Sequence, residues 1–111
     1  MDQLRAMRVL AKVADEGSFA GAARVLDMAP AVVTRVIAEL EEHLGARLMN
    51  RTTRRLSFTE AGDDYLQRAR QSLADVDEAA VRVANAVGEP RGHLRVLRPP
   101  ALAVRPVVEN P

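Results

Sequence analysis

The chain contains no cysteine and no tryptophan, and Phe19, Phe58 and Tyr65 are its only aromatic residues. Without cysteine, disulfide bonds and thiolate metal sites are excluded. The two histidines, His43 and His93, are fifty residues apart, and neither a Gly-rich phosphate loop nor an H-E-x-x-H motif occurs. We therefore expect a protein that is not an enzyme and that carries no metal or cofactor.

Long hydrophobic runs are also missing. No apolar stretch approaches the ~20 residues that a membrane-spanning helix needs. The N-terminus lacks the apolar segment of a signal peptide. These absences predict a cytoplasmic protein with no membrane contact. A length of 111 residues is enough for one small domain and an extension.

The net charge of +1 conceals an uneven distribution. Residues 1–58 hold nine basic against seven acidic side chains, whereas residues 59–88 hold three against six. Four cations fall within nine residues with no acid among them: Arg47, Arg51, Arg54 and Arg55. A solvated basic loop and a patch that contacts a polyanion are equally compatible with this cluster.

Apolar residues at intervals of three and four predict two helices before residue 28. The first is expected over residues 2–16, with an inner face of Leu4, Met7, Leu10, Ala11 and Ala14. Gly17 is suited to end it, and Ser18 to cap a second helix over residues 19–27. The inner face of the second helix comprises Phe19, Ala22, Ala23 and Leu26.

A third helix is expected from Pro30 to Gly45. Proline suits the first helical position, whereas Ala29 is a poor N-cap because it has no side-chain oxygen. One apolar stripe comprises Val33, Val36, Ile37, Leu40 and Leu44. The opposite side carries Ala31, Arg35, Ala38 and Glu42, and Thr34 lies on the flank. Its first half is therefore small, polar or basic, and free of acid.

The segment "RLMNRTTRRLSF" then has apolar anchors, Leu48, Leu56 and Phe58, around an Arg-rich centre. This pattern predicts a short two-stranded hairpin. Three helices followed by a basic hairpin make a mainly α winged helix-turn-helix domain over residues 1–58. A DNA major groove ~12 Å wide admits one helix, and the domain's third helix has the acid-free side that such entry requires.

Residues 59–88 are expected to form a long helix capped by Thr59. Its apolar residues step alternately by three and four, as in a coiled coil: Leu66, Ala69, Leu73, Val76, Ala80, Val83 and Val87. Pairing with a second copy through residues 60–88 is favoured, and packing along its own domain is the alternative. Residues 89–111 form a proline-rich tail for which no regular structure is expected.

The segments "ADEGSFAGAARVLDMA" and "VTRVIAELEEHLGARLMNRTTRRLSFTEAG" resemble the N-terminal part of LysR-type transcriptional regulators. The resemblance covers residues 1–88, and "GHLRV" is similar to the entry strand of the family's effector domain. It implies a homodimer that binds an interrupted palindrome in double-stranded DNA. The DNA contacts that it implies are Ser18, Pro30, Ala31, Thr34, Arg35, Arg51, Thr53 and Arg54.

This sequence departs from the family at three positions and in its tail. Ala29 and Pro30 stand where Ser or Thr and often Gln are usual, which shifts base reading toward Thr34 and Arg35. Met49 replaces the usual Phe of the hairpin. The tail does not clearly continue into the family's effector domain, so we expect residues 89–111 to be a stub without an inducer site.

A second function remains open from the sequence. Through residues 60–88 the chain could pair with a full-length LysR-type regulator and modulate it as a mixed dimer. Binding of DNA by the pure chain distinguishes the two functions.

Overall fold

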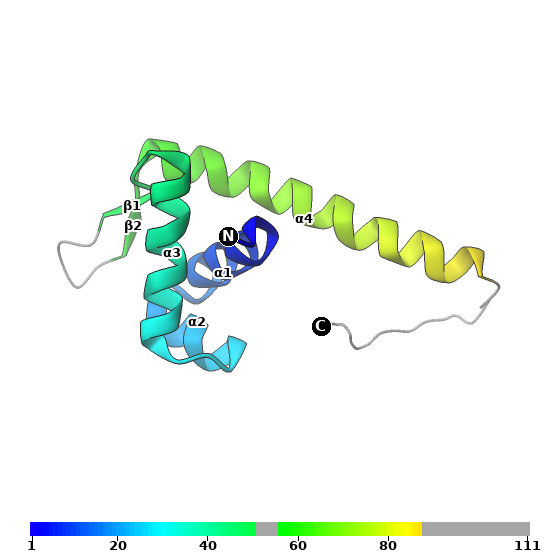
Figure 1. The fold of residues 1–111 in the computed structure, drawn as a ribbon, viewed down its shortest axis with the longest axis horizontal. Helices are drawn as coiled ribbons and strands as arrows, with labels where there is room; N and C mark the ends of the chain where they lie inside the picture. The colour runs from blue at the N-terminus through cyan, green and yellow to red at the C-terminus, as the bar shows by residue number, and fades with distance from the viewer. Residues whose placement is uncertain (51–55, 88–111) are drawn as a thin grey trace. The chain divides into compact units, whose positions relative to one another are not determined.

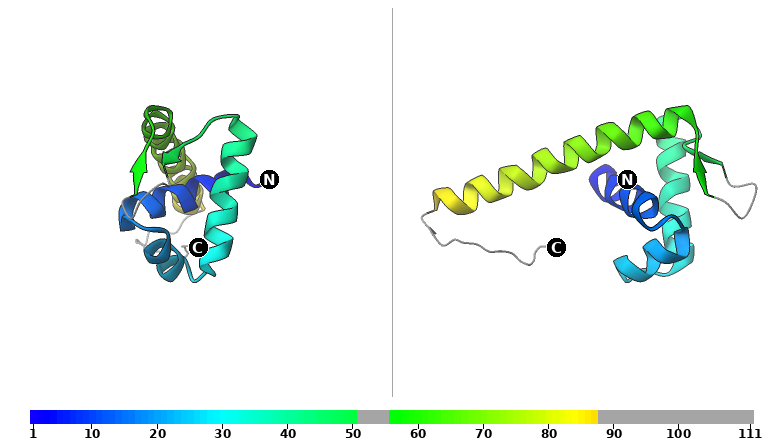
Figure 2. Two further views of the ribbon diagram at one scale, coloured as in Figure 1. Left: turned by 90° about the vertical axis from the view of Figure 1, so that its left-hand side faces the viewer. Right: turned by 180° about the vertical axis from the view of Figure 1, so that it is seen from behind.

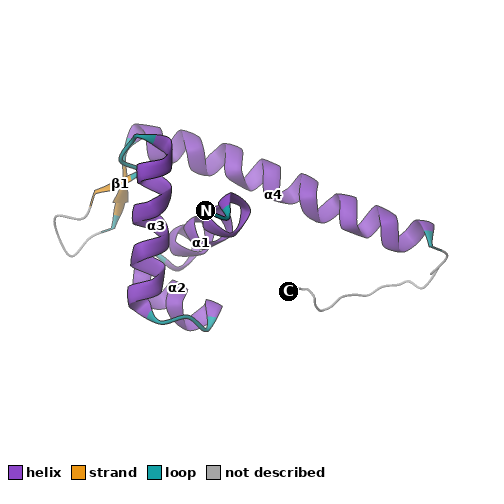
Figure 3. Cartoon of the chain, in the orientation of Figure 1, coloured by secondary structure: helices purple, strands orange, loops and turns teal. Residues whose placement is uncertain are grey.

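The computed structural model describes residues 1–50 and 56–87 of the chain. Its elements are α1 (Gln3–Glu16), α2 (Phe19–Leu26), α3 (Pro30–Leu44), β1 (Met49–Asn50), β2 (Ser57–Phe58) and α4 (Glu60–Ala86). Figure 1 shows this order along the chain, and Figure 3 distinguishes the helices from the strands by colour. The expected mainly α fold, with three helices, a hairpin and a long helix, is confirmed. The chain divides into two compact units after Ala74, and each is described separately below.

The helix ends follow from local chemistry. The Asp2 carboxylate accepts the Arg5 amide at 3.1 Å, so α1 begins one residue later than expected. Ser18 Oγ accepts the Gly21 amide at 2.9 Å, which confirms Ser18 as the cap of α2. Gly17 and Gly45 end α1 and α3 with φ of 75° and 71°, a left-handed conformation that glycine adopts without steric penalty.

The core of the first unit lies between α1, α2 and α3, which all pack on one another. Figure 2 shows α1 crossing α3, with α2 beside the N-terminal end of α3. The buried stripe of α3 and the small residues of α2 are as expected. The fully buried side chains of the core include Leu10, Val13, Ala22, Val33, Ile37, Leu40, Leu48 and Met49.

The inner face of α1 differs from the expected one. Ala6, Val9 and Val13 are buried, whereas Leu4 is 43% exposed. Apolar residues occur around most of this helix, so two stripes that share Leu10 fit the sequence equally well. Because α2 and α3 both pack on α1, the stripe that faces both of them is the one that becomes buried.

The hairpin is antiparallel, and Met49 pairs with Phe58 and Asn50 with Ser57. Met49 is fully buried, which confirms it as the core residue at the position where the family has Phe. Three predicted DNA contacts, Arg51, Thr53 and Arg54, lie outside the described residues, as does the tail from residue 88.

The start of α4 is attached to the two residues that precede β1. Thr59 Oγ1 accepts the Gly62 amide at 2.9 Å and donates to the Arg47 carbonyl at 2.7 Å. The Thr59 amide also donates to the Leu48 carbonyl at 2.9 Å. Gly62 lies so close to this carbonyl that a Cβ added to it would stand 1.9 Å from the Leu48 oxygen. The predicted Thr59 cap is thus present, and it fixes α4 to the hairpin.

The early turns of α4 pack within the first unit. Gln3 Nε2 donates to the Tyr65 hydroxyl at 3.2 Å, and Arg70 forms a 2.9 Å ion pair with Asp15. Ala69 and Leu73 are buried, and Leu66 is packed against the core. These three residues of the predicted seam therefore pack against the chain's own domain, which was the alternative to pairing with a second copy. A three-four seam matches any facing helix, so the sequence pattern could not identify which helix covers it.

The described part of the second unit is the remainder of α4. Val76, Val83 and Val87 are 40%, 63% and 73% exposed, and Ala80 is exposed as well. The ion pair between Arg82 and Glu78, four residues apart, lies on the polar side of this segment. The later half of the predicted seam is therefore accessible to a partner.

Candidate nucleic-acid interface

One side of α3 is exposed and carries no acid in its first two turns. Ala31, Thr34, Arg35 and Ala38 are all exposed, while Val33 and Ile37 on the opposite side are fully buried. The exposed acidic residues of α3, Glu39 and Glu42, lie in the second half of the helix. The N-terminal half is thus the part that can approach a polyanion without carboxylate repulsion.

Thr34 and Arg35 differ in what they can offer to a ligand. The Thr34 hydroxyl donates to the Pro30 carbonyl at 3.2 Å, so its hydrogen is used within the helix while its methyl and lone pairs remain available. Arg35 has no hydrogen-bond or ion-pair partner among the residues that the structure describes. Its guanidinium can therefore make two parallel hydrogen bonds to a guanine edge or to a phosphate.

The N-terminus of α3 is uncapped by any side chain, as expected from Ala29. The amides of Val32 and Val33 both donate to the Ala29 carbonyl, and Pro30 has no amide hydrogen. Within residues 1–50 and 56–87, the Ala31 amide is the one in this first turn that has no acceptor. An anion at this position would meet both that amide and the positive end of the helix dipole.

A serine at position 29 should correct this missing cap. Ala29 has φ −67° and ψ 140°, which is the backbone conformation of an N-cap residue. We expect Ala29→Ser to raise the free energy of unfolding by ~0.5–2 kcal/mol. It should also leave DNA affinity equal or higher, because the hydroxyl can donate to a phosphate. Thermal melting checks the first effect, and a lower melting temperature would contradict the observed start of α3.

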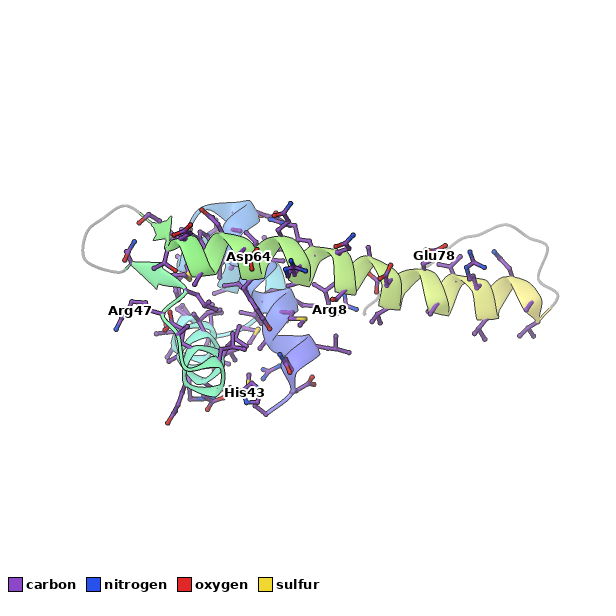
Figure 4. All side chains as sticks on the ribbon, turned by 90° about the horizontal axis from the view of Figure 1, so that it is seen from above. Arg8, His43, Arg47, Asp64 and Glu78 are labelled. Carbon is purple, nitrogen blue, oxygen red and sulfur yellow. The ribbon has the colours of Figure 1, made fainter. Side chains whose placement is uncertain are left out.

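Of the predicted contacts outside α3, Ser18 is the one that the structure describes, and it caps α2. Ser18 Oγ accepts an amide in the α2 cap, so its hydroxyl hydrogen is still available to a phosphate. Figure 4 shows Arg47 beside the hairpin and His43 on the last turns of α3. Arg47 is exposed. In the sequence it belongs to the same basic cluster as Arg51 and Arg54, which are predicted contacts in the segment between β1 and β2, here called the wing.

Glu41 has a role that the sequence interpretation missed. The sequence pattern assigns no partner to this residue, which lies in the second half of α3, but its Oε2 accepts the amides of Leu48 and Met49 at 2.8 and 3.2 Å. A signal was present in the sequence. At 100° per residue, Glu41 lies at the edge of the apolar stripe, whereas Glu42 lies opposite it.

The described residues offer neither a cluster of metal ligands nor a helix that could span a membrane. Across residues 1–50 and 56–87, no group of three or more His, Asp or Glu side chains could hold a metal ion. In the same residues, no helix is long and apolar enough to cross a membrane.

Comparison with known proteins agrees with this geometry. The family described as "Bacterial regulatory helix-turn-helix protein, lysR family" matches residues 4–63. An HTH-type transcriptional repressor of Pseudomonas aeruginosa is 43% identical over 96 residues, which are 86% of this chain and 30% of the repressor. The regulator CrgA of Neisseria meningitidis is 42% identical over 81% of this chain and 30% of its own length. This chain thus spans about a third of the length of these curated relatives.

Solved structures show the same fold. The BenM DNA-binding domain in complex with catB site 1 DNA is 32% identical, with a TM-score of 0.76 over 85% of this chain and 100% of that domain. The CbnR DNA-binding domain in complex with DNA is 31% identical, with a TM-score of 0.72 over 78% of this chain and 99% of that domain. This chain therefore belongs to the LysR family of bacterial helix-turn-helix regulators.

Proposed function

We propose that the chain is a transcriptional regulator that binds a specific, interrupted palindrome in double-stranded DNA as a homodimer. The observation that carries the proposal is the exposed, acid-free half of α3 with the exposed Arg35 on it. The DNA complexes of the BenM and CbnR domains support the assignment of DNA as ligand. As a regulator that acts on bacterial DNA, the chain would function in the cytoplasm.

The roles of the helices follow from their dimensions. An α-helix with side chains is ~10–12 Å across, close to the width of the major groove. With Ala31 and Ala38 as its small residues, α3 can enter deeply enough for Arg35 and Thr34 to reach base edges. Ser18 and the amide of Ala31 would contact phosphates, and the Arg-rich segment between β1 and β2 would contact the adjacent backbone or minor groove.

The homodimer is proposed from the second unit alone. Val76, Ala80, Val83 and Val87 follow a three-four spacing, and all four are exposed in the single chain. A stripe of this kind becomes buried when two helices pair. Two copies related by a twofold axis would place two α3 helices on two half-sites, which gives the palindrome its symmetry.

Arg35→Ala tests base reading directly. The side chain is exposed and lies opposite the core, so we expect little change in melting temperature. We expect discrimination between operator bases to fall by ~1–3 kcal/mol at the position that Arg35 contacts. Competition binding with single-base operator variants measures this effect.

Thr34→Ala is the matched comparison on the same face. Because the Thr34 hydroxyl already donates within the helix, its loss should relax discrimination less than the loss of Arg35. If Arg35→Ala keeps full base discrimination, this face of α3 does not read the sequence. If the pure chain binds no DNA but copurifies with a longer regulator, the mixed-dimer function replaces the one proposed.

A further inference from the structure

The carboxylate of Glu41 connects α3 to the root of the hairpin. A single oxygen, Oε2, accepts two backbone amides, from Leu48 at 2.8 Å and from Met49 at 3.2 Å. Both hydrogen bonds are partly buried, and an ionised acceptor makes them stronger than bonds between neutral groups. Met49 is the first residue of β1, so this contact lies where the hairpin begins.

The same short segment is also bound by Thr59, the residue that precedes α4. The Thr59 amide donates to the Leu48 carbonyl at 2.9 Å, and its hydroxyl donates to the Arg47 carbonyl at 2.7 Å. The side chains of Leu48 and Met49 are fully buried. The root of the hairpin is thus fixed through its side chains and through backbone bonds to two helices, and Glu41 supplies the bonds from α3.

Glu41 does not belong to the face of α3 that would meet DNA. It is half-buried, whereas Thr34, Arg35 and Ala38 are exposed. Its charge is directed toward two amide hydrogens, which reduces the repulsion that a carboxylate would otherwise exert on nearby phosphates. Glu41 can therefore carry a negative charge on α3 without opposing DNA binding, because the amides of Leu48 and Met49 bind its carboxylate.

We propose that Glu41 is a positioning residue for DNA binding, which holds the hairpin at a fixed place on α3 so that wing and helix contact DNA together. This inference rests on the proposed function, since it assumes that both elements contact DNA. It assigns to Glu41 a role in binding although Glu41 itself touches no DNA. The wing contacts should then weaken when the two bonds of Glu41 are lost.

Two substitutions of Glu41 separate the effect of side-chain length from the effect of charge. Glu41→Gln removes the charge but keeps an oxygen at the same reach, so it should retain both bonds. Glu41→Asp keeps the charge but shortens the side chain by one methylene, so it should lose them. Glu42→Gln and Glu42→Asp are the matched controls, because Glu42 is the adjacent, exposed glutamate on the same helix.

The first measurement needs no DNA. Amide hydrogen exchange of Leu48 and Met49 is followed by NMR in the full chain, under conditions where circular dichroism shows every variant folded. We expect exchange at least about tenfold faster in Glu41→Asp, which corresponds to ~1.4 kcal/mol, a smaller increase in Glu41→Gln, whose neutral oxygen makes weaker bonds, and near the original rate in both Glu42 variants. Unchanged exchange in Glu41→Asp would overturn the proposal.

The second measurement is a double-mutant cycle with Arg54→Ala, a substitution in the predicted wing. The slope of log affinity against log salt is compared for the four proteins, because each lost phosphate contact lowers it by about one. We expect Arg54→Ala to lower the slope in the original chain and to change it by less than half as much in Glu41→Asp. An equal change in both backgrounds, or no change in either, overturns the role of Glu41 in binding.

The two proposals can fail separately. If the original chain binds no DNA, the proposed function fails, and the role of Glu41 in DNA binding fails with it, whatever the exchange rates show. If the original chain binds DNA and the cycle is additive, the proposed function stands and only the positioning role is removed.

Discussion

Gly62→Ala should destabilise the first unit more than any other single methyl addition in the described chain. In an ordinary helix this change stabilises by ~0.5–1 kcal/mol, since alanine is the better helix former. Here the new Cβ would stand 1.9 Å from the Leu48 carbonyl oxygen, a backbone atom that cannot rotate away. We expect the free energy of unfolding to fall by ~3 kcal/mol or more, and the melting temperature to fall by roughly 10–25 °C.

Gly45→Ala is the control for this measurement. An added Cβ at Gly45 meets no atom within 4 Å, but φ is +71°, so the expected loss is only ~1–2 kcal/mol from backbone strain. Thermal melting of both variants separates the two effects. A Gly62→Ala protein that melts at or above the original temperature would show that α4 does not start against the Leu48 carbonyl.

Val83→Asp should have the largest effect on DNA binding. Val83 is 63% exposed in the single chain, so a charge there leaves the fold intact. In a paired helix the same charge would be buried without a partner, which opposes dimerisation. A monomer reaches only one half-site at a time, and affinity for a complete palindrome should fall by about 100-fold or more.

The matched control is Val81→Asp, two residues away. Val81 is 56% exposed, but it lies about 160° around the helix from Val83, outside the seam. It should remain dimeric in sedimentation and keep its affinity for the palindrome. Leu73 lies at the centre of the predicted seam but is buried within the first unit. Leu73→Asp would therefore destabilise the first unit and would not test dimerisation separately. A dimeric Val83→Asp protein would remove this stripe from the interface.

Most of the fold could be predicted because local chemistry specifies it. Ser18, Gly17, Pro30 and Gly45 are residues whose side chain or backbone preference marks a helix end, and each is found at that end. The stripe of α3 was also unambiguous, since its opposite side is polar or small. These predictions depend only on neighbours within a few residues along the chain.

The errors arose where distant segments decide the outcome. The face of α1 and the partner of Leu66, Ala69 and Leu73 depend on which helices pack nearby, and a periodic pattern does not contain that information. The hydrogen bonds of Glu41 were missed for the same reason, since its two amide donors are seven and eight residues away across a loop. Of the predicted interface, the exposed residues of α3 follow from the sequence, whereas the fixation of the hairpin follows only from the structure.

Selection of binding sites from random double-stranded DNA by the purified chain tests the central claim most directly. It requires no knowledge of the operator and reports specificity and symmetry together. The account predicts enrichment of two inverted half-sites separated by a spacer, with base preference in the half-sites reduced by Arg35→Ala. Enrichment of no sequence, or of a single half-site without an inverted copy, would contradict a homodimer that reads DNA through α3.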